Sequence, residues 1–175
     1  MGRLTRGNQL TDYYQHQYQA PVAGTQSPDD LTLPLYGATF GQALRRFFAS
    51  YLTSAGRASR SEFWWVALVA AAVSAVGVAL IGIGNALTGE EASGVGMIPT
   101  IIGVVVFLVS GFIFGIGSIC LTIRRLHDIN ASGWWYLPIF LLGPIPLVGF
   151  LVYIAIIVIG VLPSNPSGIR FDARS

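Results

Sequence analysis

The sequence contains no lysine, one cysteine and little charge of either sign. All ten basic residues among its 175 positions are arginine, and charged residues make up 10% of the chain, against about 25% in ordinary soluble domains. The lone Cys120 excludes a disulfide or a cysteine-rich metal site within one chain. A formal net charge of +2, without basic runs that alternate with aromatic residues, argues against a nucleic-acid partner.

Long uncharged stretches are abundant instead. Hydrophobic residues make up 53% of the chain and occur in blocks rather than in the periodic pattern of soluble helices. The blocks 64–83 and 99–123 carry no charge, and about twenty apolar residues in a helix cross a hydrocarbon core of about 30 Å. The sequence therefore predicts an all-α integral membrane protein embedded in a lipid bilayer.

The last apolar block, 134–162, is too long for one upright helix and too short for two complete crossings. The stretch Gly143–Pro146 interrupts it, because proline removes a helix hydrogen bond and clashes with the preceding turn. We expect three transmembrane segments, with the third broken at this stretch. A partial hairpin that returns to its starting side, and so gives four helices, is the alternative.

Polar segments flank the membrane domain, which we place at 35–172. Residues 1–34 are rich in Tyr, Gln and Pro and predict a disordered cytoplasmic tail, while 163–175 form a polar C-terminal tail. Residues 40–52 have a helical rhythm, with bulky apolar side chains on one face and arginines elsewhere. This pattern predicts a short amphipathic helix lying in the headgroup plane. A short helix packed on the protein's own loops is the alternative.

Arginine is distributed unevenly about the predicted spans. Four arginines closely precede the first span and two lie between the second and third, whereas the acidic loop with Glu90 and Glu91 contains none. The positive-inside rule then places the N-terminus and the Arg124 region in the cytoplasm. Three crossings place Arg170 and Arg174 outside, a mild conflict that a hairpin removes.

Capping and interfacial residues mark the ends of the predicted helices. Ser59 and Glu62 have the spacing of a capping box, which predicts a helix start just ahead of the first span. Four tryptophans at the ends of the apolar blocks are predicted interface anchors, namely Trp64, Trp65, Trp134 and Trp135.

Small residues recur at helical spacing within both long spans, as close helix packing requires. They are Ala67, Ala71 and Ala75 in the first span and Gly111 and Gly115 in the second. We expect these two faces to pack on each other within one chain. A seam between two copies of the chain is the alternative.

Two phrases at the ends of the spans resemble a known family. One reads GRASRSEFWW from Gly56 to Trp65, and the other reads RRLHDINASGWW from Arg124 to Trp135. They closely resemble domain-of-unknown-function family 805, and the likeness covers about residues 44–172. The resemblance implies a multi-pass protein of the bacterial cytoplasmic (inner) membrane and supplies no established activity. The long leader and the wording of the C-terminal tail depart from the family pattern.

Both phrases place arginine just ahead of paired tryptophans at the same predicted membrane face. The cluster comprises Arg57, Arg60, Glu62, Arg124, Arg125, His127 and Asp128. We expect an ion-paired clasp in which Glu62 pairs with Arg124 or Arg125. The alternative is a site for anionic lipid headgroups, because guanidinium groups bind phosphate in bidentate fashion.

His127 beside Asp128 could act as a general base oriented by a carboxylate. The sequence has no second histidine near the membrane and no recognised catalytic motif, and it offers too few ligands for a zinc site. We therefore predict no enzymatic activity, cofactor or metal. The leading prediction is an accessory or scaffold subunit that contacts other membrane proteins or a second copy of itself. The alternatives are an oligomeric transporter or channel for ions or small solutes, and an anionic-lipid-binding protein.

Overall fold

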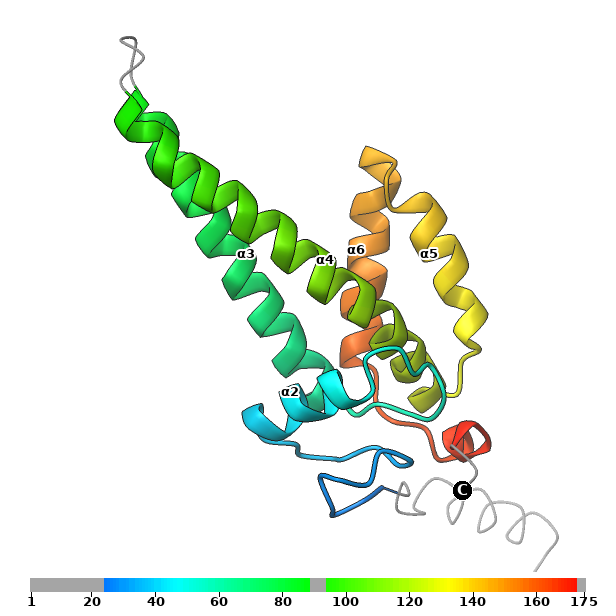
Figure 1. The fold of residues 1–175 in the computed structure, drawn as a ribbon. Helices are drawn as coiled ribbons and strands as arrows, with labels where there is room; N and C mark the ends of the chain where they lie inside the picture. The colour runs from blue at the N-terminus through cyan, green and yellow to red at the C-terminus, as the bar shows by residue number, and fades with distance from the viewer. Residues whose placement is uncertain (1–23, 89–93, 173–175) are drawn as a thin grey trace, which may run out of the picture.

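The computed structural model describes residues 24–88 and 94–172, which form helices and loops throughout. Two long helices run antiparallel, and a shorter pair stands beside them (Figure 1). The predicted all-helical class is confirmed. In chain order the elements are α2 (Phe40–Ala49), α3 (Arg60–Thr88), η1 (Gly94–Gly96), α4 (Met97–Asp128), η2 (Gly133–Trp135), α5 (Tyr136–Leu142), α6 (Pro146–Val161) and η3 (Pro166–Phe171).

The two long helices, α3 and α4, have the length and composition of membrane spans. At 1.5 Å per residue, the 29 residues of α3 and the 32 of α4 give about 43 and 48 Å, more than a hydrocarbon core of about 30 Å. Only 11% of the most apolar stretch of α3, and 17% of that of α4, is buried within the chain. A soluble protein covers such surfaces with its own core, so this exposure favours lipid around the two helices.

Helices α3 and α4 meet along glycines that recur every seven residues. A Cβ atom added at Gly103 would lie 2.6 Å from the carbonyl oxygen of Gly77, and one added at Gly84 would lie 2.7 Å from that of Gly96. Side-chain carbons do not come this close to backbone oxygens, so the approach requires glycine. Seven residues are about two helical turns, and the repeat therefore keeps the seam on one face of each helix.

This seam is not the one expected from the sequence. Ala71 and Ala75 are exposed and Ala67 is half-buried, while a Cβ atom added at Gly111 or Gly115 would meet no other described residue within 4 Å. The prediction that these two faces pack on each other within one chain is wrong. The seven-residue glycines allow the backbones a closer approach, and the register they set leaves the Gly111 and Gly115 face of α4 open.

The last apolar block forms two helices instead of one span. The predicted break is present, because α5 ends at Leu142 and α6 begins at Pro146. Between them the Ile145 N–H donates to the Leu142 carbonyl at 3.1 Å, and α6 runs back beside α5 (Figure 1). The 16 residues of α6 give only about 24 Å. The last apolar block therefore forms the hairpin that was given as the alternative, and not the expected third crossing.

Helix α2 lies beside the start of α3, at the end of the molecule where α4 and α6 also terminate (Figure 1). We call this end the base; it comprises α2, its flanking loops, the ends of these three helices and residues 163–172. The Thr39 N–H donates to Gln42 Oε1 at 2.9 Å, capping α2. Phe47 and Arg46 are buried against the protein, whereas Phe48 is 53% exposed. The helix thus packs on the protein's own loops, as in the alternative prediction, and its outer face remains apolar.

Both polar tails contribute residues to the base. Residues 1–23 and 173–175 lie outside the described part of the chain, as does the loop with Glu90 and Glu91. Residues 24–34, predicted to be disordered, form a loop in which the Thr25 N–H donates to the Pro34 carbonyl at 3.0 Å. Residues 24–34 are therefore not the disordered tail that the sequence predicted, because the base supplies partners for this loop.

Candidate functional site

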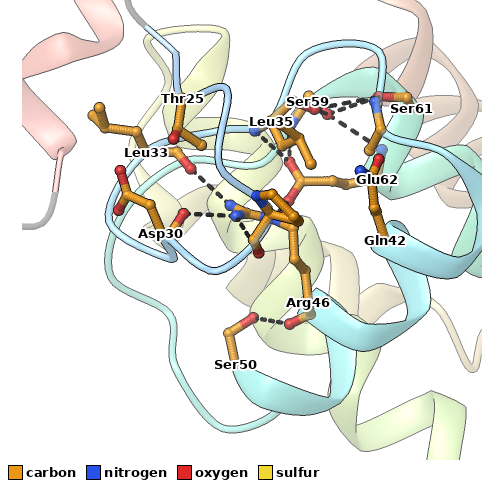
Figure 2. Close-up of polar contacts among 12 residues, drawn as sticks. Thr25, Asp30, Leu33, Leu35, Gln42, Arg46, Ser50, Ser59, Ser61 and Glu62 are labelled. Carbon is orange, nitrogen blue, oxygen red and sulfur yellow. Dashed lines mark hydrogen bonds and ion pairs between the residues drawn. The ribbon is translucent and has the colours of Figure 1, made fainter.

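A buried ion pair joins α2 to the start of α3. Arg46 Nε lies 2.5 Å from Glu62 Oε1, and the two side chains are 1% and 3% exposed (Figure 2). Glu62 Oε2 accepts hydrogen bonds from the N–H groups of Ser59 at 2.8 Å and Leu35 at 3.3 Å. The Glu62 N–H donates in return to Ser59 Oγ at 3.2 Å. These two reciprocal bonds confirm the predicted capping box.

The remaining guanidinium nitrogens of Arg46 hold the N-terminal loop against α2. Nη1 donates to the carbonyls of Asp30 at 2.6 Å and Pro28 at 3.2 Å, and Nη2 donates to that of Leu33 at 2.7 Å (Figure 2). A buried guanidinium is tolerated only when a carboxylate balances its charge and acceptors satisfy its other N–H groups. Arg46 meets both conditions and links the N-terminal loop to α2 and α3.

A second buried centre surrounds the carboxylate at the end of α4. Asp128 Oδ2 is ion-paired with Arg125 Nη1 and accepts a hydrogen bond from Ser164 Oγ at 2.5 Å. Asp128 Oδ1 accepts one from the Tyr36 hydroxyl at 2.9 Å and lies 3.7 Å from Arg57 Nη1. These partners come from the N-terminal loop, the loop before α3, α4 itself and the segment after α6. One carboxylate thus joins four segments of the base.

The surroundings of Asp128 change the pKa of the Tyr36 hydroxyl. Burial, followed by the negative charge of Asp128, raises the pKa of Tyr36 above its ordinary value of 10.0. The hydroxyl therefore stays protonated and continues to donate to Asp128 at any ordinary pH.

Arg57 and Arg125 have further partners in the same centre. Arg57 forms a bidentate pair with Asp172, with Nε–Oδ1 and Nη2–Oδ2 distances of 2.5 and 2.9 Å. Arg125 donates from Nε to the Ile159 carbonyl at 3.1 Å and from Nη2 to the Leu162 carbonyl. The last carbonyls of a helix have no partner within it. Arg125 therefore caps α6 and holds its end against α4.

Arg124 differs from the other buried arginines. Its side chain is 2% exposed, yet its Nε has no hydrogen-bond partner among the described residues. Its backbone carbonyl accepts a bond from the Ala58 N–H at 3.1 Å. Glu62 and Arg46 lie close enough to act on the Arg124 charge, with opposite signs. Arg124 thus adds positive charge beside the Arg46–Glu62 pair.

His127 binds the loop before α3 and not the adjacent aspartate. Its Nδ1 lies 3.0 Å from the carbonyl oxygen of Gly56, and its ring stacks on that of Phe171 with centroids 4.3 Å apart. Gly56 has φ +82°, a conformation that favours glycine. Because the Asp128 carboxylate serves Arg125, Tyr36, Ser164 and Arg57, the two neighbours do not form the hydrogen-bonded pair of a general base.

Arg60 is the one exposed member of the four predicted cluster arginines. Together with Ser61 it lines two adjoining hollows. The first, of about 530 Å³, has hydroxyl groups from Tyr36 and Ser164 in its lining. The second, of about 430 Å³, is walled by apolar side chains from α3, namely Trp64, Trp65 and Leu68.

The four predicted interface tryptophans fall into two pairs. Trp64 Nε1 donates to the Gly160 carbonyl and Trp65 Nε1 to the Ala38 carbonyl, each at 3.1 Å, so these rings also fasten α6 and the N-terminal loop. Trp134 and Trp135, in η2, are 80% and 65% exposed. Their rings project outward, as anchors at a membrane surface do.

The predicted cluster residues lie together in the base, but several of their partners were assigned wrongly. Glu62 pairs with Arg46, not with Arg124 or Arg125, and Arg125 pairs with Asp128. The burial of Arg57, Arg124 and Arg125 also removes three of the four guanidinium groups from reach of lipid headgroups. Sequence reasoning missed four residues of the two centres: Tyr36, Arg46, Ser164 and Asp172.

The scarcity of acidic residues was a signal for at least one of these omissions. The chain has only 8 acidic residues against 10 arginines, so a buried arginine group needs most of the acids available. Asp172, in the segment predicted as a polar C-terminal tail, is one of them. Arg46 gave no such signal, because an arginine on the polar face of an amphipathic helix ordinarily faces water. Among the described residues, no group of three His, Cys, Asp or Glu side chains is arranged to hold a metal ion.

Two span-length apolar helices standing on a buried arginine–carboxylate base define a helical membrane protein. The chain belongs to the DUF805 family, described as "Protein of unknown function", whose model matches residues 51–173. This confirms the resemblance drawn from the two signature phrases, both of which fall within the match.

Two curated relatives from Escherichia coli (strain K12) are similar to the chain. Inner membrane protein YhaH is 33% identical over 123 residues, which cover 70% of this chain and 86% of the relative. Inner membrane protein YhaI is 32% identical over 103 residues, which cover 59% of this chain and 71% of the relative. No solved structure is significantly similar to the chain.

Proposed function

We propose that this protein is a non-enzymatic inner-membrane subunit that acts through contacts between membrane helices, while the base holds its own helices in place. The open face of α4 carries this proposal. Gly111 and Gly115 are exposed there, although α4 packs on α3 through other glycines. Glycine inside a helix is less favourable than alanine by about 1 kcal/mol. A second helix packed closely on this face offsets that cost, because small residues four apart let two backbones approach.

A second copy of the chain is the partner that we infer. It brings an identical face, and the commonest closed assembly places two such faces against each other about a two-fold axis. The described part of α4 carries no charge between Met97 and Ile123 that would oppose this contact within the bilayer.

Energy transfer between donor- and acceptor-labelled full-length chains in phosphatidylcholine vesicles tests this proposal. Gly111→Leu combined with Gly115→Leu is expected to weaken association at least tenfold, because the leucines hold the backbones apart. The matched control is Gly82→Leu, since a Cβ atom at Gly82 on α3 also meets no described residue within 4 Å. Unchanged association in the double variant, or equal loss in the control, contradicts the proposal.

The distribution of arginine supports a bacterial inner-membrane location with the base in the cytoplasm. The curated relatives are named as inner membrane proteins, and every arginine in the described residues belongs to the base or its loops. Arg170 lies there too, since its Nη2 donates to the Asn130 carbonyl at 3.3 Å. The return of α6 thereby removes the conflict that three crossings create for Arg170 under the positive-inside rule.

Arg60 favours anionic-lipid binding as a second candidate function. Its exposed guanidinium lines the first hollow and can bind a phosphate there, and the adjoining hollow beside Trp64 and Trp65 suits the upper part of an acyl chain. Quenching of tryptophan fluorescence by brominated phosphatidylglycerol, compared with brominated phosphatidylcholine, tests it. Arg60→Gln is expected to abolish the preference for phosphatidylglycerol. The exposed Arg45→Gln serves as control and is expected to retain it; equal effects of the two changes contradict this candidate.

A further inference from the structure

The hollow between α4 and α5 is lined by the His127 imidazole. It measures about 660 Å³, within the usual range of about 300–1,000 Å³ for small-ligand sites. Its walls are mainly apolar and come from both helices and η2, with Ile119, Ile123, Trp134, Leu137 and Phe140. His127 lines it as well, together with Ser54 and Ser132.

The hydrogen bond at His127 Nδ1 determines whether the other ring nitrogen, Nε2, is a donor or an acceptor. The partner of Nδ1 is the Gly56 carbonyl at 3.0 Å, and a carbonyl oxygen only accepts. Nδ1 therefore carries the proton of the neutral ring, which leaves Nε2 as a hydrogen-bond acceptor. The stack on Phe171 holds the ring in this orientation.

Nε2 faces the hollow next to Gly133. A Cβ atom added at Gly133 would lie 3.1 Å from Nε2, and Gly133 itself lines the hollow. Nε2 has no hydrogen-bond partner among the described residues. An acceptor in the wall of a mainly apolar cavity matches a ligand that has a hydrogen-bond donor on an apolar chain.

We propose that this hollow binds an uncharged bilayer lipid with a free hydroxyl on its headgroup, such as a diacylglycerol or a long-chain alcohol. The hydroxyl donates to His127 Nε2, and the chain runs along α4 past Ile123 and Ile119. The eight residues from 127 to 119 span about 12 Å away from the base, into the apolar part of the helix. None of the lining residues is ionisable except His127 and Tyr136, so nothing in the wall balances a charged headgroup. This inference is independent of the helix contacts and of the Arg60 hollows.

The direct test compares two ligands that differ only in the donor. The probes are 9,10-dibromostearyl alcohol and its methyl ether, added to the full-length protein in phosphatidylcholine vesicles, whose headgroups contain no donor. Bromine quenches nearby tryptophan, and Trp134 in the wall is the reporter; Trp134→Phe identifies its share of the signal. The alcohol is expected to bind about three- to tenfold more tightly than the ether, as one hydrogen bond provides. Equal binding of the two probes overturns the proposal, as does tighter binding of ionised 9,10-dibromostearic acid.

Two substitutions locate the effect at Nε2. In His127→Asn the amide nitrogen can keep the bond to Gly56, while the group that faces the hollow is removed. Gly133→Ala keeps the imidazole and adds a methyl group that would lie 3.1 Å from Nε2 and 2.7 Å from Ile123 Cγ2, so it crowds the acceptor and the adjoining wall. Each variant is expected to reduce the alcohol-over-ether preference to less than twofold. A preference that persists in Gly133→Ala and in a folded His127→Asn overturns the assignment.

Discussion

The Tyr36 hydroxyl donates a 2.9 Å hydrogen bond to the Asp128 carboxylate across 92 positions of sequence. Asp128 is completely buried and simultaneously serves Arg57 and Arg125. A carboxylate with these neighbours holds the base together mainly because its removal leaves two buried cations without their partner. The stability of the whole helical assembly is therefore expected to be more sensitive at Asp128 than at any exposed ion pair.

Asp128→Asn tests this dependence directly. Loss of one partner from a buried charge group destabilises by about 3–5 kcal/mol, and the free energy of unfolding in detergent measures it. Asp29→Asn is the control, because Asp29 pairs with Arg45 on the surface, where both side chains are more than half exposed. The control is expected to change little; similar losses in both variants contradict the role given to Asp128.

Arg46→Ala is expected to release the N-terminal loop. The substitution removes the donors to the carbonyls of Pro28, Asp30 and Leu33 and leaves Glu62 buried without its cation. Limited proteolysis followed by mass spectrometry is expected to show faster cleavage between residues 26 and 36. The adjacent Arg45→Ala removes only the exposed ion pair with Asp29 of the same loop and is expected to change the cleavage rate little, because surface ion pairs contribute little.

The two sets of glycines in α4 are expected to respond differently to the same change. Gly103→Ala places a methyl group against the Gly77 carbonyl and is expected to destabilise by about 1–3 kcal/mol. Gly111→Ala meets open space and is expected to keep or slightly raise stability, since alanine is the better helix former. Thermal unfolding in detergent compares them. An equal loss at both positions contradicts the register of α3 against α4.

Alkaline pH provides a test of the Tyr36 environment. The folded protein holds the Tyr36 proton to a pKa above the value of 10.0 that applies in the unfolded chain. The unfolded chain therefore binds fewer protons above pH 10, and stability falls as the pH rises past that point. Tyr36→Phe is expected to be less stable at pH 8 by about 1.5–3 kcal/mol, through loss of a hydrogen bond to a charged group. The difference between the two proteins should shrink between pH 10 and 12, and a constant difference contradicts this account.

Labelling of single cysteines tests the topology. In a Cys120→Ser background, cysteines at positions 55 and 167 are expected to react from the same side of the membrane, because the base contains both. A cysteine at position 92, in the loop between the two long helices, is expected to react from the opposite side. If cysteines at positions 167 and 92 are labelled from the same side of the membrane, the chain has a third crossing.

The long helices and the charged residues at their ends could be predicted from the sequence. Uncharged runs of span length predicted α3 and α4, and Ser59 with Glu62 predicted the start of α3, because both signals are local. The phrases around Arg57 and Arg125 placed the charged residues at one end. These features depend on composition and on the spacing of neighbours along the chain.

Pairings between distant segments were not predictable in the same way. Helix α4 carries glycines four residues apart and others seven residues apart, and only the approach of α3 decides which set is used. Arg46 lies on the polar side of its helix. The loop that covers it has the length and polarity of a disordered tail, so the sequence did not indicate their contact. The hairpin of α5 and α6 likewise depends on the bonds from Arg125 to the end of α6, which follow from tertiary packing.

The capping of α6 by Arg125 has a consequence for how the protein is made. While the ribosome is still producing residues after Asp128, the arginines at the foot of α3 and α4 lack the carbonyls of α6 and the carboxylate of Asp172. Because positive charge resists translocation, we expect these arginines to help set the orientation of the first two helices at that stage. Once the remaining chain emerges, the same guanidinium groups become its buried attachment points, so we expect one set of residues first to orient the nascent protein and then to fasten its last segment.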